Sequence, residues 1–306
     1  MLGRMLIAIA VAAFSLSPVA ARAQEGMAPV ESGHVEVNGL AYYYEVHGEG
    51  EPLLLLHGGL GHTGMFAPIL PALSKGRTVI GVDLQGHGRT ALGARPIDIA
   101  DMGRDMGQLV EKLGYDRVDV MGYSMGGGVA AQMAVQYPER VRRLVLVSTP
   151  ASKDGFYPEI VEQMHQINGG MAEAMRDTPM YQSYAAVAPR VEDFPKLLDA
   201  MGDLMRRPDI YDIEVEALEM PVMLVYGDSD MFRLGHVVAF YRRLGGGLRD
   251  AGWQREHMSQ NRLAILPGRT HYDIFFAPAL VPTARSFLDG ESATGSWAEQ
   301  VGAGQQ

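Results

Sequence analysis

Apolar positions along the chain form short runs of two kinds. Residues 34–37 and 41–46 alternate between apolar and polar side chains, and Asn38-Gly39 between them is a hairpin signal. A solid apolar run, typical of a strand covered on both faces, follows at residues 52–56, and further strand-like runs rich in apolar residues lie at residues 78–84, 118–121, 141–147, 222–226 and 262–266. Segments with helical spacing lie between them, at residues 66–73, 97–113, 237–244 and 279–288. This alternation predicts an α/β fold with a doubly wound, mostly parallel sheet.

The alternation of strands and helices stops between Pro150 and Pro221. This stretch has helical apolar spacing, no clear strand and many methionine and tyrosine residues. We interpret it as a helical cap or lid, residues 151–217, on a core made of residues 24–150 and 218–289. Pliable methionine side chains suit the lining of an apolar substrate pocket, although any single one is expected simply to pack the cap onto the core. Residues 290–306 are small and polar, and we expect a disordered tail there.

A serine at a strand-to-helix turn is the strongest chemical signal in the chain. The motif Gly122-x-Ser124-x-Gly126 follows the apolar run that ends at Met121, and small, helix-tolerant residues resume after it. Glycine on both sides lets the backbone bend tightly, so the serine at the apex is forced into a strained conformation that projects its hydroxyl off the sheet. A simpler interpretation is a glycine-rich turn whose serine is merely small. The strand-to-helix context favours a nucleophile.

Three further strand ends carry polar residues beside glycine. His57-Gly58-Gly59 ends one predicted strand, Gly227-x-x-Asp230 ends another, and Gly268-x-x-His271 ends the last. In an open α/β sheet, ligands bind outside the carboxyl ends of the strands, so these residues are expected to converge on Ser124. A neutral serine is a poor nucleophile, and His271 is therefore expected to accept its proton during attack on a carbonyl.

With these four motifs in order, and with Asp83-x-x-Gly86-His87-Gly88 at the end of the run over residues 78–84, the chain resembles the α/β-hydrolase superfamily over nearly all of the sequence that follows residue 23. The resemblance implies the α/β-hydrolase fold with a helical cap and a catalytic triad of Ser124, Asp230 and His271.

The resemblance also implies an oxyanion hole, formed by the backbone N–H groups of Gly59 and Met125. Asp230 holds the superfamily position of the triad acid, at the end of its glycine-containing turn. Asp228, in the same turn, is an alternative acid. Asp154 is a more distant alternative, because in this superfamily the acid sometimes follows the preceding strand.

The nucleophile separates the reactions within this superfamily. Haloalkane dehalogenases and epoxide hydrolases of the fold carry aspartate at the position of Ser124, because an alkyl-enzyme ester needs a carboxylate. A serine indicates acyl chemistry, and we expect a carboxylesterase-like enzyme that cleaves small or aryl esters through an acyl-enzyme. Carbon–carbon bond hydrolases and cofactor-free haloperoxidases or perhydrolases of the same fold are alternatives. A non-catalytic ligand-binding protein on this fold is a third hypothesis.

The other histidines near the motifs are expected to be structural. His57 would shape the oxyanion loop through local hydrogen bonds, and His87 would hold the loop of the Asp83 motif. His236 and Asp273 also lie near motifs, and we assign them no chemical role.

The first 23 residues have the features of a Sec-type signal peptide. Arg4 precedes an apolar stretch, residues 5–16, that is too short to span a bilayer comfortably, and Ala21-Arg22-Ala23 has the small-x-small pattern of a cleavage site. We therefore expect a periplasmic or secreted protein, without stable membrane association once this segment is removed.

Composition narrows the possible partners. The chain has 306 residues, no cysteine and a formal net charge of −10, which becomes −12 without the two arginines of residues 1–23. An acidic surface disfavours nucleic acids and anionic membranes, so a small-molecule ester is the expected partner. Without cysteine, neither disulfides nor lipid attachment at a lipobox is possible. No histidine or carboxylate cluster has zinc-ligand spacing, and we expect neither a metal nor a cofactor.

Overall fold

The computed structural model describes residues 27–290. The predicted signal peptide, and the predicted tail beyond Gly290, lie outside these residues. Within them, eight strands form one sheet: β1 (Glu31–Val37), β2 (Leu40–His47), β3 (Glu51–Leu56), β4 (Arg77–Val82), β5 (Val118–Tyr123), β6 (Val141–Val147), β7 (Val222–Ser229) and β8 (Arg262–Thr270).

The sheet is mostly parallel, as the sequence predicts. Its order is β1-β2-β4-β3-β5-β6-β7-β8. β2 runs antiparallel to β1 and β4, and every other neighbouring pair is parallel. The predicted hairpin joins β1 to β2. Asn38 and Gly39 have φ angles of 49° and 80°, the left-handed backbone that a tight hairpin turn requires.

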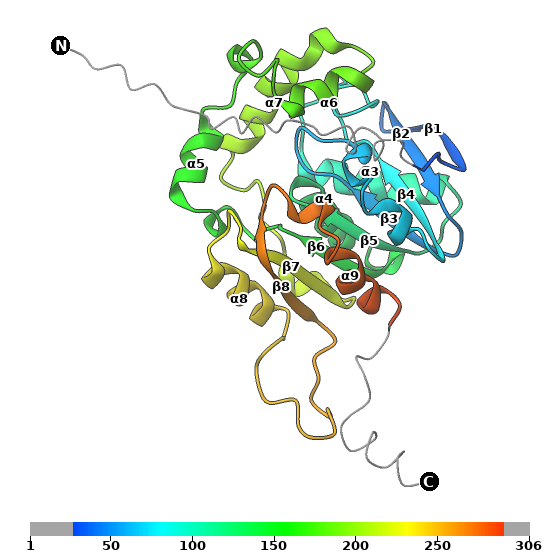
Figure 1. Cartoon of the computed structure of the whole chain (residues 1–306), viewed down its shortest axis with the longest axis vertical. Helices are drawn as coiled ribbons and strands as arrows, with labels where there is room; N and C mark the ends of the chain where they lie inside the picture. The colour runs from blue at the N-terminus through cyan, green and yellow to red at the C-terminus, as the bar shows by residue number, and fades with distance from the viewer. Residues whose placement is uncertain (1–26, 291–306) are drawn as a thin grey trace, which may run out of the picture.

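Helices cover both faces of the sheet (Figure 1). Helices α3, α4 and α8 pack on one face, and α2 and α9 on the other. In β3, Leu54 and Leu56 face the first group while Leu53 and Leu55 face the second, so this strand is a solid apolar run. The bounds are α2 (Leu70–Leu73), α3 (Ile99–Lys112), α4 (Met125–Gln136), α8 (Leu234–Arg243) and α9 (Leu280–Leu288).

Three α-helices lie between β6 and β7, in the stretch that we interpret as a cap: α5 (Pro158–His165), α6 (Pro179–Val187) and α7 (Phe194–Arg206). Helices α6 and α7 gather at one end of the molecule, at the top of Figure 1. Tyr181 and Tyr184 of α6 pack against Phe194 of α7, with ring centroids 5.0 and 5.1 Å apart. Met164 and Met201 are buried in the same apolar cluster as α3 and α4. These two methionines therefore pack α5 and α7 onto the core, and Tyr184 of α6 belongs to the same cluster.

The single helix predicted over residues 66–73 is wrong in part. The structure has a 3₁₀ turn, η1 (Thr63–Phe66), followed by the one-turn helix α2. Pro68 lacks an N–H, and its ring clashes with the preceding turn of a helix, so one continuous helix cannot form there. Pro71 lies in the first turn of α2, where the missing N–H has no cost.

Strand β8 is longer than predicted and carries His271 to the site. The expected strand stops at Leu266, whereas the observed one continues past Pro267 to Thr270, which pairs with Ser229 of β7. Because β8 is the edge strand of the sheet, a proline is tolerated in it. His271 follows the last paired residue directly.

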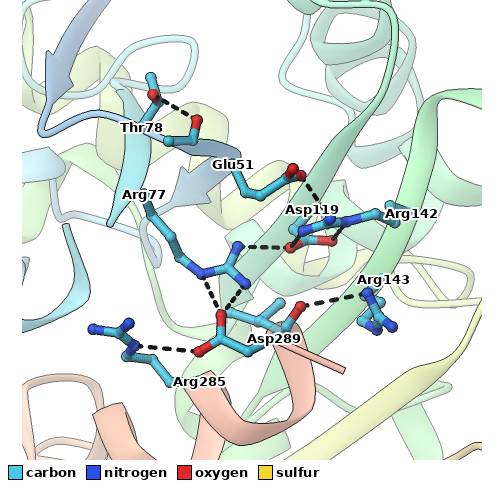
Figure 2. Close-up of polar contacts among 10 residues, drawn as sticks. Glu51, Arg77, Thr78, Asp119, Arg142, Arg143, Arg285 and Asp289 are labelled. Atoms are coloured by element: carbon cyan, nitrogen blue, oxygen red, sulfur yellow. Dashed lines mark hydrogen bonds and ion pairs between the residues drawn. The ribbon is translucent and has the colours of Figure 1, made fainter. Parts of the chain in front are cut away.

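A network of charged side chains lies at the amino ends of the central strands (Figure 2). Arg77 of β4 donates to Asp119 of β5 at 2.7 Å and to Asp289, just after α9, at 2.6 Å. Arg142 of β6 donates to Asp119 through Nε at 2.8 Å and to Glu51 of β3 at 2.6 Å. The network joins four strands to the last helix, at the edge of the sheet opposite Ser124.

Candidate active site

Ser124 occupies the sharp turn between β5 and α4. Its φ and ψ angles are 53° and −120°, so it is one of the few residues other than glycine with positive φ in the described chain. This backbone region is strained for a residue with a side chain. The turn expected from the sequence, with a strained serine at its apex, is thus present. The half-buried hydroxyl lies at the carboxyl edge of the sheet.

The flanking glycines are required by close packing around the turn. A Cβ atom at Gly122 would lie 2.3 Å from the carbonyl oxygen of Gly126, and one at Gly126 would lie 2.3 Å from that of His57. Gly127 is equally constrained, since a Cβ there would lie 1.8 Å from Oγ1 of Thr149. Any side chain at these positions would push α4 away from β3 and β6.

The structure brings Ser124, His271 and Asp230 together. Oγ of Ser124 lies 3.1 Å from Nε2 of His271, and Nδ1 of the same ring lies 3.1 Å from Oδ1 of Asp230. The His271 and Asp230 side chains are only 7% and 2% exposed. A hydroxyl, an imidazole and a carboxylate in this series can transfer the serine proton and hold the resulting cation.

The two alternative acids do not reach the imidazole. Asp228 is exposed, and both of its carboxylate oxygens accept from the N–H of Gly268, at 2.9 and 3.0 Å. Asp154 is also exposed, on the short turn η3 (Lys153–Gly155). Among the three candidate acids, Asp230 is the one in contact with His271.

Sequence reasoning missed Ser148, which supports Asp230. Ser148 follows β6 directly, is fully buried and has a φ of 48°. Its hydroxyl donates to Oδ2 of Asp230, which also accepts from the N–H of Gly227 at 3.2 Å, while Oδ1 accepts from the N–H of Met231 at 2.8 Å. These donors hold the carboxylate towards His271. A serine directly after a solid strand was the available signal.

The two expected oxyanion donors lie on adjoining segments. Met125 begins α4, where the first N–H groups have no partner within the helix and the helix dipole is positive. A Cβ atom at Gly58 would lie 3.2 Å from Cβ of Ser124, so the loop after β3 touches the nucleophile turn. A Cβ at Gly59 would lie 3.0 Å from Cε of Met201 in α7. Met201 of α7 therefore covers this loop.

His57 joins the oxyanion loop to the loop after β4, in line with the structural role expected for it. Its Nδ1–H donates to the carbonyl of Gly58 at 2.7 Å, and its Nε2 accepts from the N–H of Leu84 at 2.9 Å. Full burial lowers the pKa of His57 to about 3, and the neighbouring His87 contributes to this lowering. The ring is neutral at physiological pH, and it acts as a fixed brace.

His87 is a second buried, neutral imidazole. Its Nδ1–H donates to the carbonyl of Gln85 at 2.8 Å, and burial lowers its pKa to about 4. Its ring lies 5.4 Å from that of His57. Neither histidine contacts Ser124 in the described residues, so both belong to the scaffold of the loops.

We expect the buried, neutral imidazoles to make the folded protein less stable in acid. Above pH 6.5 His87 is neutral in both the folded and the unfolded state, so it does not change the free energy of unfolding. Below pH 6.5 the imidazole is protonated in the unfolded chain but stays neutral in the folded one. The free energy of unfolding then falls by roughly 1.4 kcal/mol per pH unit for such a group, down to about pH 4. In His87→Gln, urea titrations between pH 6 and 5 should show a slope reduced by about 1 kcal/mol per pH unit.

The control for that prediction is His34→Gln, which removes a solvent-exposed imidazole from edge strand β1. It should leave the pH dependence of unfolding as it is in the wild type. An unchanged slope in His87→Gln would contradict the assignment of acid sensitivity to this buried ring.

Aromatic side chains form a wall beside the imidazole. Phe232 lies 5.6 Å from the His271 ring, Phe156 lies 4.7 Å from Phe232, and Tyr211 lies 5.7 Å from Phe156. Burial raises the pKa of the Tyr211 hydroxyl, and its interaction with the Ser124 side chain opposes that rise. The wall is uncharged. Its members come from loops after β6, α7 and β7, far apart in the sequence.

The two residues to which the sequence assigned no chemical role, His236 and Asp273, stay outside this constellation. Nε2 of His236 accepts from the N–H of Ala151 at 3.0 Å, and Asp273 accepts from the N–H and the hydroxyl of Thr270 at 2.7 and 2.8 Å. Both contacts are structural. Across residues 27–290, the side chains of histidine, aspartate and glutamate form no group of three that could hold a metal ion. In the same range no helix has the length and apolar character of a membrane span.

Comparison with known proteins supports the fold and the family. The model of the family described as alpha/beta hydrolase fold matches residues 51–179. The putative carbamate hydrolase RutD of Azorhizobium caulinodans is 37% identical over 125 residues, 41% of this chain and 47% of that protein. The serine hydrolase BPHL of Mus musculus is 26% identical over 268 residues, 85% of this chain and 87% of that protein.

A solved structure of similar shape is a thermophilic esterase from Thermogutta terrifontis. It has a TM-score of 0.64 at 23% identity and covers 86% of this chain and 99% of its own. Several curated relatives are matched over only about half of their length, 47% for RutD and 52% for an uncharacterized Mycobacterium bovis protein. The matching family model and these relatives support placing the chain in the α/β-hydrolase superfamily, and the solved structure shares its fold.

Proposed function

We propose that this protein is a serine hydrolase that cleaves carboxylic esters through an acyl-enzyme on Ser124. The observation that carries the proposal is the hydrogen-bonded series from Ser124 through His271 to Asp230 at the carboxyl edge of the sheet. Each member has the chemistry that its place in the series requires.

In the proposed reaction, Nε2 of His271 takes the proton of Ser124 as Oγ attacks the ester carbonyl. The N–H groups of Gly59 and Met125 bind the oxyanion of the tetrahedral intermediate. His271 then returns the proton to the departing alcohol, and the acyl group remains on Ser124. A water molecule, deprotonated by His271, attacks the acyl-enzyme and releases the acid. Asp230 fixes the imidazole and stabilises its charged form throughout.

The surroundings of the triad favour an uncharged, partly aromatic ester. Phe156, Phe232 and Tyr211 form an aromatic wall on the side of His271, and Met201 lies over the oxyanion loop. Such side chains bind apolar and aryl groups by area and ring contact. We propose that residues 151–217 act as a lid whose apolar side chains contact the acyl or alcohol group.

A serine nucleophile disfavours the reaction of one curated relative. This relative is a soluble epoxide hydrolase from Corynebacterium, 37% identical over 111 residues. Opening an epoxide through an alkyl-enzyme ester needs a carboxylate nucleophile, which Ser124 does not supply. Attack on a carbonyl is the reaction that a serine and a histidine promote. Carbon–carbon bond hydrolysis and perhydrolysis share this nucleophile, and a panel of substrates separates them.

The panel compares p-nitrophenyl acetate, butyrate and octanoate, a vinylogous diketone, and acetate with hydrogen peroxide. We expect turnover of the esters, fastest with the shorter acyl groups, and little reaction with the diketone or peroxide. Efficient cleavage of the diketone with weak ester turnover would show a carbon–carbon bond hydrolase instead. Peracid formation as the dominant reaction would show a perhydrolase.

We further propose that residues 1–23 direct export to the periplasm or the medium. The charged start, the apolar stretch and the Ala21-Arg22-Ala23 pattern support this proposal. Expression of the full chain, followed by fractionation and N-terminal sequencing, should give an exported protein that begins at Gln24. A protein retained in the cytoplasm with its first residues intact would contradict it.

A further inference from the structure

The residue before the nucleophile, Tyr123, takes no part in the proposed reaction. Tyr123 is the last residue of β5 and is 6% exposed. Its side chain points to the face of the sheet covered by α2 and α9, together with Met121. Ser124 follows it in the strained turn, and the N–H of Ser124 donates to the carbonyl of Val147 at 2.9 Å. Tyr123 and Ser124 are therefore held by one rigid piece of backbone.

The hydroxyl of Tyr123 contacts the backbone of the base. It donates to the carbonyl oxygen of His271 at 2.6 Å, across 148 positions of sequence. Burial raises the pKa of this hydroxyl, and Asp230 raises it further, so the group keeps its proton and remains a donor at any pH at which the enzyme works.

The ring of Tyr123 contacts the imidazole itself. The two ring centroids lie 5.1 Å apart with an angle of 36° between the planes. Phe275 packs against Tyr123 at 4.9 Å and 39°. A Cβ atom at Gly58 would lie 2.7 Å from the Tyr123 ring, so the oxyanion loop presses on the same side chain. Tyr123 thus touches the loop of the base and the loop of the oxyanion hole.

We infer that Tyr123 is a positioning residue that holds His271 at hydrogen-bond distance from Ser124. The inference rests on the proposed function, because it assigns Tyr123 a role in the same reaction. Residues 123 and 124 are adjacent, so any shift of the turn moves the nucleophile and the anchor of its base together. The distance from Oγ of Ser124 to Nε2 of His271 therefore stays constant, although the two residues come from distant parts of the chain.

The test is Tyr123→Phe, which removes the hydroxyl and keeps the ring. With p-nitrophenyl acetate, kcat should fall about tenfold while KM stays within about twofold, because ground-state binding of the ester is unaffected. The second-order rate of Ser124 labelling by a fluorophosphonate should fall by a similar factor. Tyr123→Leu removes the ring contact as well, and both rates should fall about 100-fold.

The matched control is Tyr42→Phe. Tyr42 is fully buried, and its hydroxyl also donates at 2.6 Å, but to Asp105 on α3, away from His271. Both phenylalanine variants lose a buried hydroxyl and the hydrogen bond that it donates, and Tyr42→Phe also loses the one that this hydroxyl accepts from Arg95 at 3.0 Å. With rates expressed per folded molecule from urea unfolding, Tyr42→Phe should label as fast as the wild type.

Phe275→Leu gives an independent route that leaves Tyr123 in place. Removing the packing of Phe275 on the Tyr123 ring should slow labelling severalfold without raising KM. Labelling of Tyr123→Phe and Phe275→Leu at the wild-type rate per folded molecule would overturn the inference. Absence of labelling in the wild type would instead overturn the proposed function, so the two failures are distinguishable.

Discussion

Replacement of Ser124 by alanine is expected to lower kcat/KM for p-nitrophenyl esters by roughly 10⁵-fold. The substitution removes the atom that forms the acyl-enzyme and leaves His271 without a proton to accept. Residual turnover would come from binding and the oxyanion donors alone. Steady-state kinetics on the purified variant, with the wild type at matched concentration, measures the ratio.

The appropriate control is Ser148→Ala, because Ser148 is a buried hydroxyl in contact with the same triad. It donates to Asp230 and lies on the far side of that carboxylate from the nucleophile in the series of hydrogen bonds. Loss of one hydrogen bond to a charged group is expected to reduce kcat about tenfold. Comparable losses of activity in Ser124→Ala and Ser148→Ala would show that Ser124 supports the structure of the site and is not the nucleophile. More than about 1% residual activity in Ser124→Ala would contradict a serine mechanism.

Replacement of Asp119 by asparagine is expected to lower the free energy of unfolding by about 3–5 kcal/mol. Asp119 is fully buried and lies between the guanidinium groups of Arg77 and Arg142, and Arg77 is itself only 1% exposed. Without the carboxylate, the buried guanidinium of Arg77 and the partly exposed one of Arg142 face each other, and each keeps only its more exposed partner, Asp289 or Glu51. Desolvated charge of this kind is costly when its partner is removed, although the intact pair contributes little by itself.

Urea unfolding with an unchanged m-value measures this loss. Glu173→Gln breaks the pair between Glu173 and Arg176, whose side chains are 80% and 61% exposed, and serves as the control. Its effect should be below about 1 kcal/mol. The Asp119 network lies at the sheet edge opposite Ser124, so activity per folded molecule should not change. A loss for Asp119→Asn no larger than that of the control would contradict the network's role.

Local patterns in the sequence were sufficient to predict the strands of the sheet and the turn that carries Ser124. Strand β6 occupies the predicted residues 141–147, because the short run of valine and leucine over residues 144–147, followed by a serine, favours a buried strand. The turn at Ser124 could be predicted because its glycines are demanded by backbone contacts within a few residues and by β3. One topological rule, that parallel strands end at the same edge, then brought Asp230 and His271 into consideration.

Contacts made across the chain could not be predicted in this way. Ser148 and Tyr123 are ordinary residues at the ends of their strands in sequence, and only the tertiary structure shows that one touches Asp230 and the other His271. The alternative triad acid after β6, Asp154, does not contact His271. The residue after β6 that takes part in the site is Ser148, the first residue after the strand, and it donates to the carboxylate of Asp230. The pairing of Arg77 with Asp119 depends on the order of the strands in the sheet, which the hydrophobic periodicity of the sequence does not predict.

The central claim is that Ser124 is the nucleophile and His271 its base. The most direct measurement is peptide-level mass spectrometry after reaction with a fluorophosphonate, in which the serine oxygen displaces fluoride from phosphorus. We predict a single adduct on Ser124 in the wild type, and a labelling rate lower by at least about 1,000-fold in His271→Ala. Ester turnover by a protein whose Ser124 remains unmodified, or labelling that is indifferent to His271, would contradict this claim.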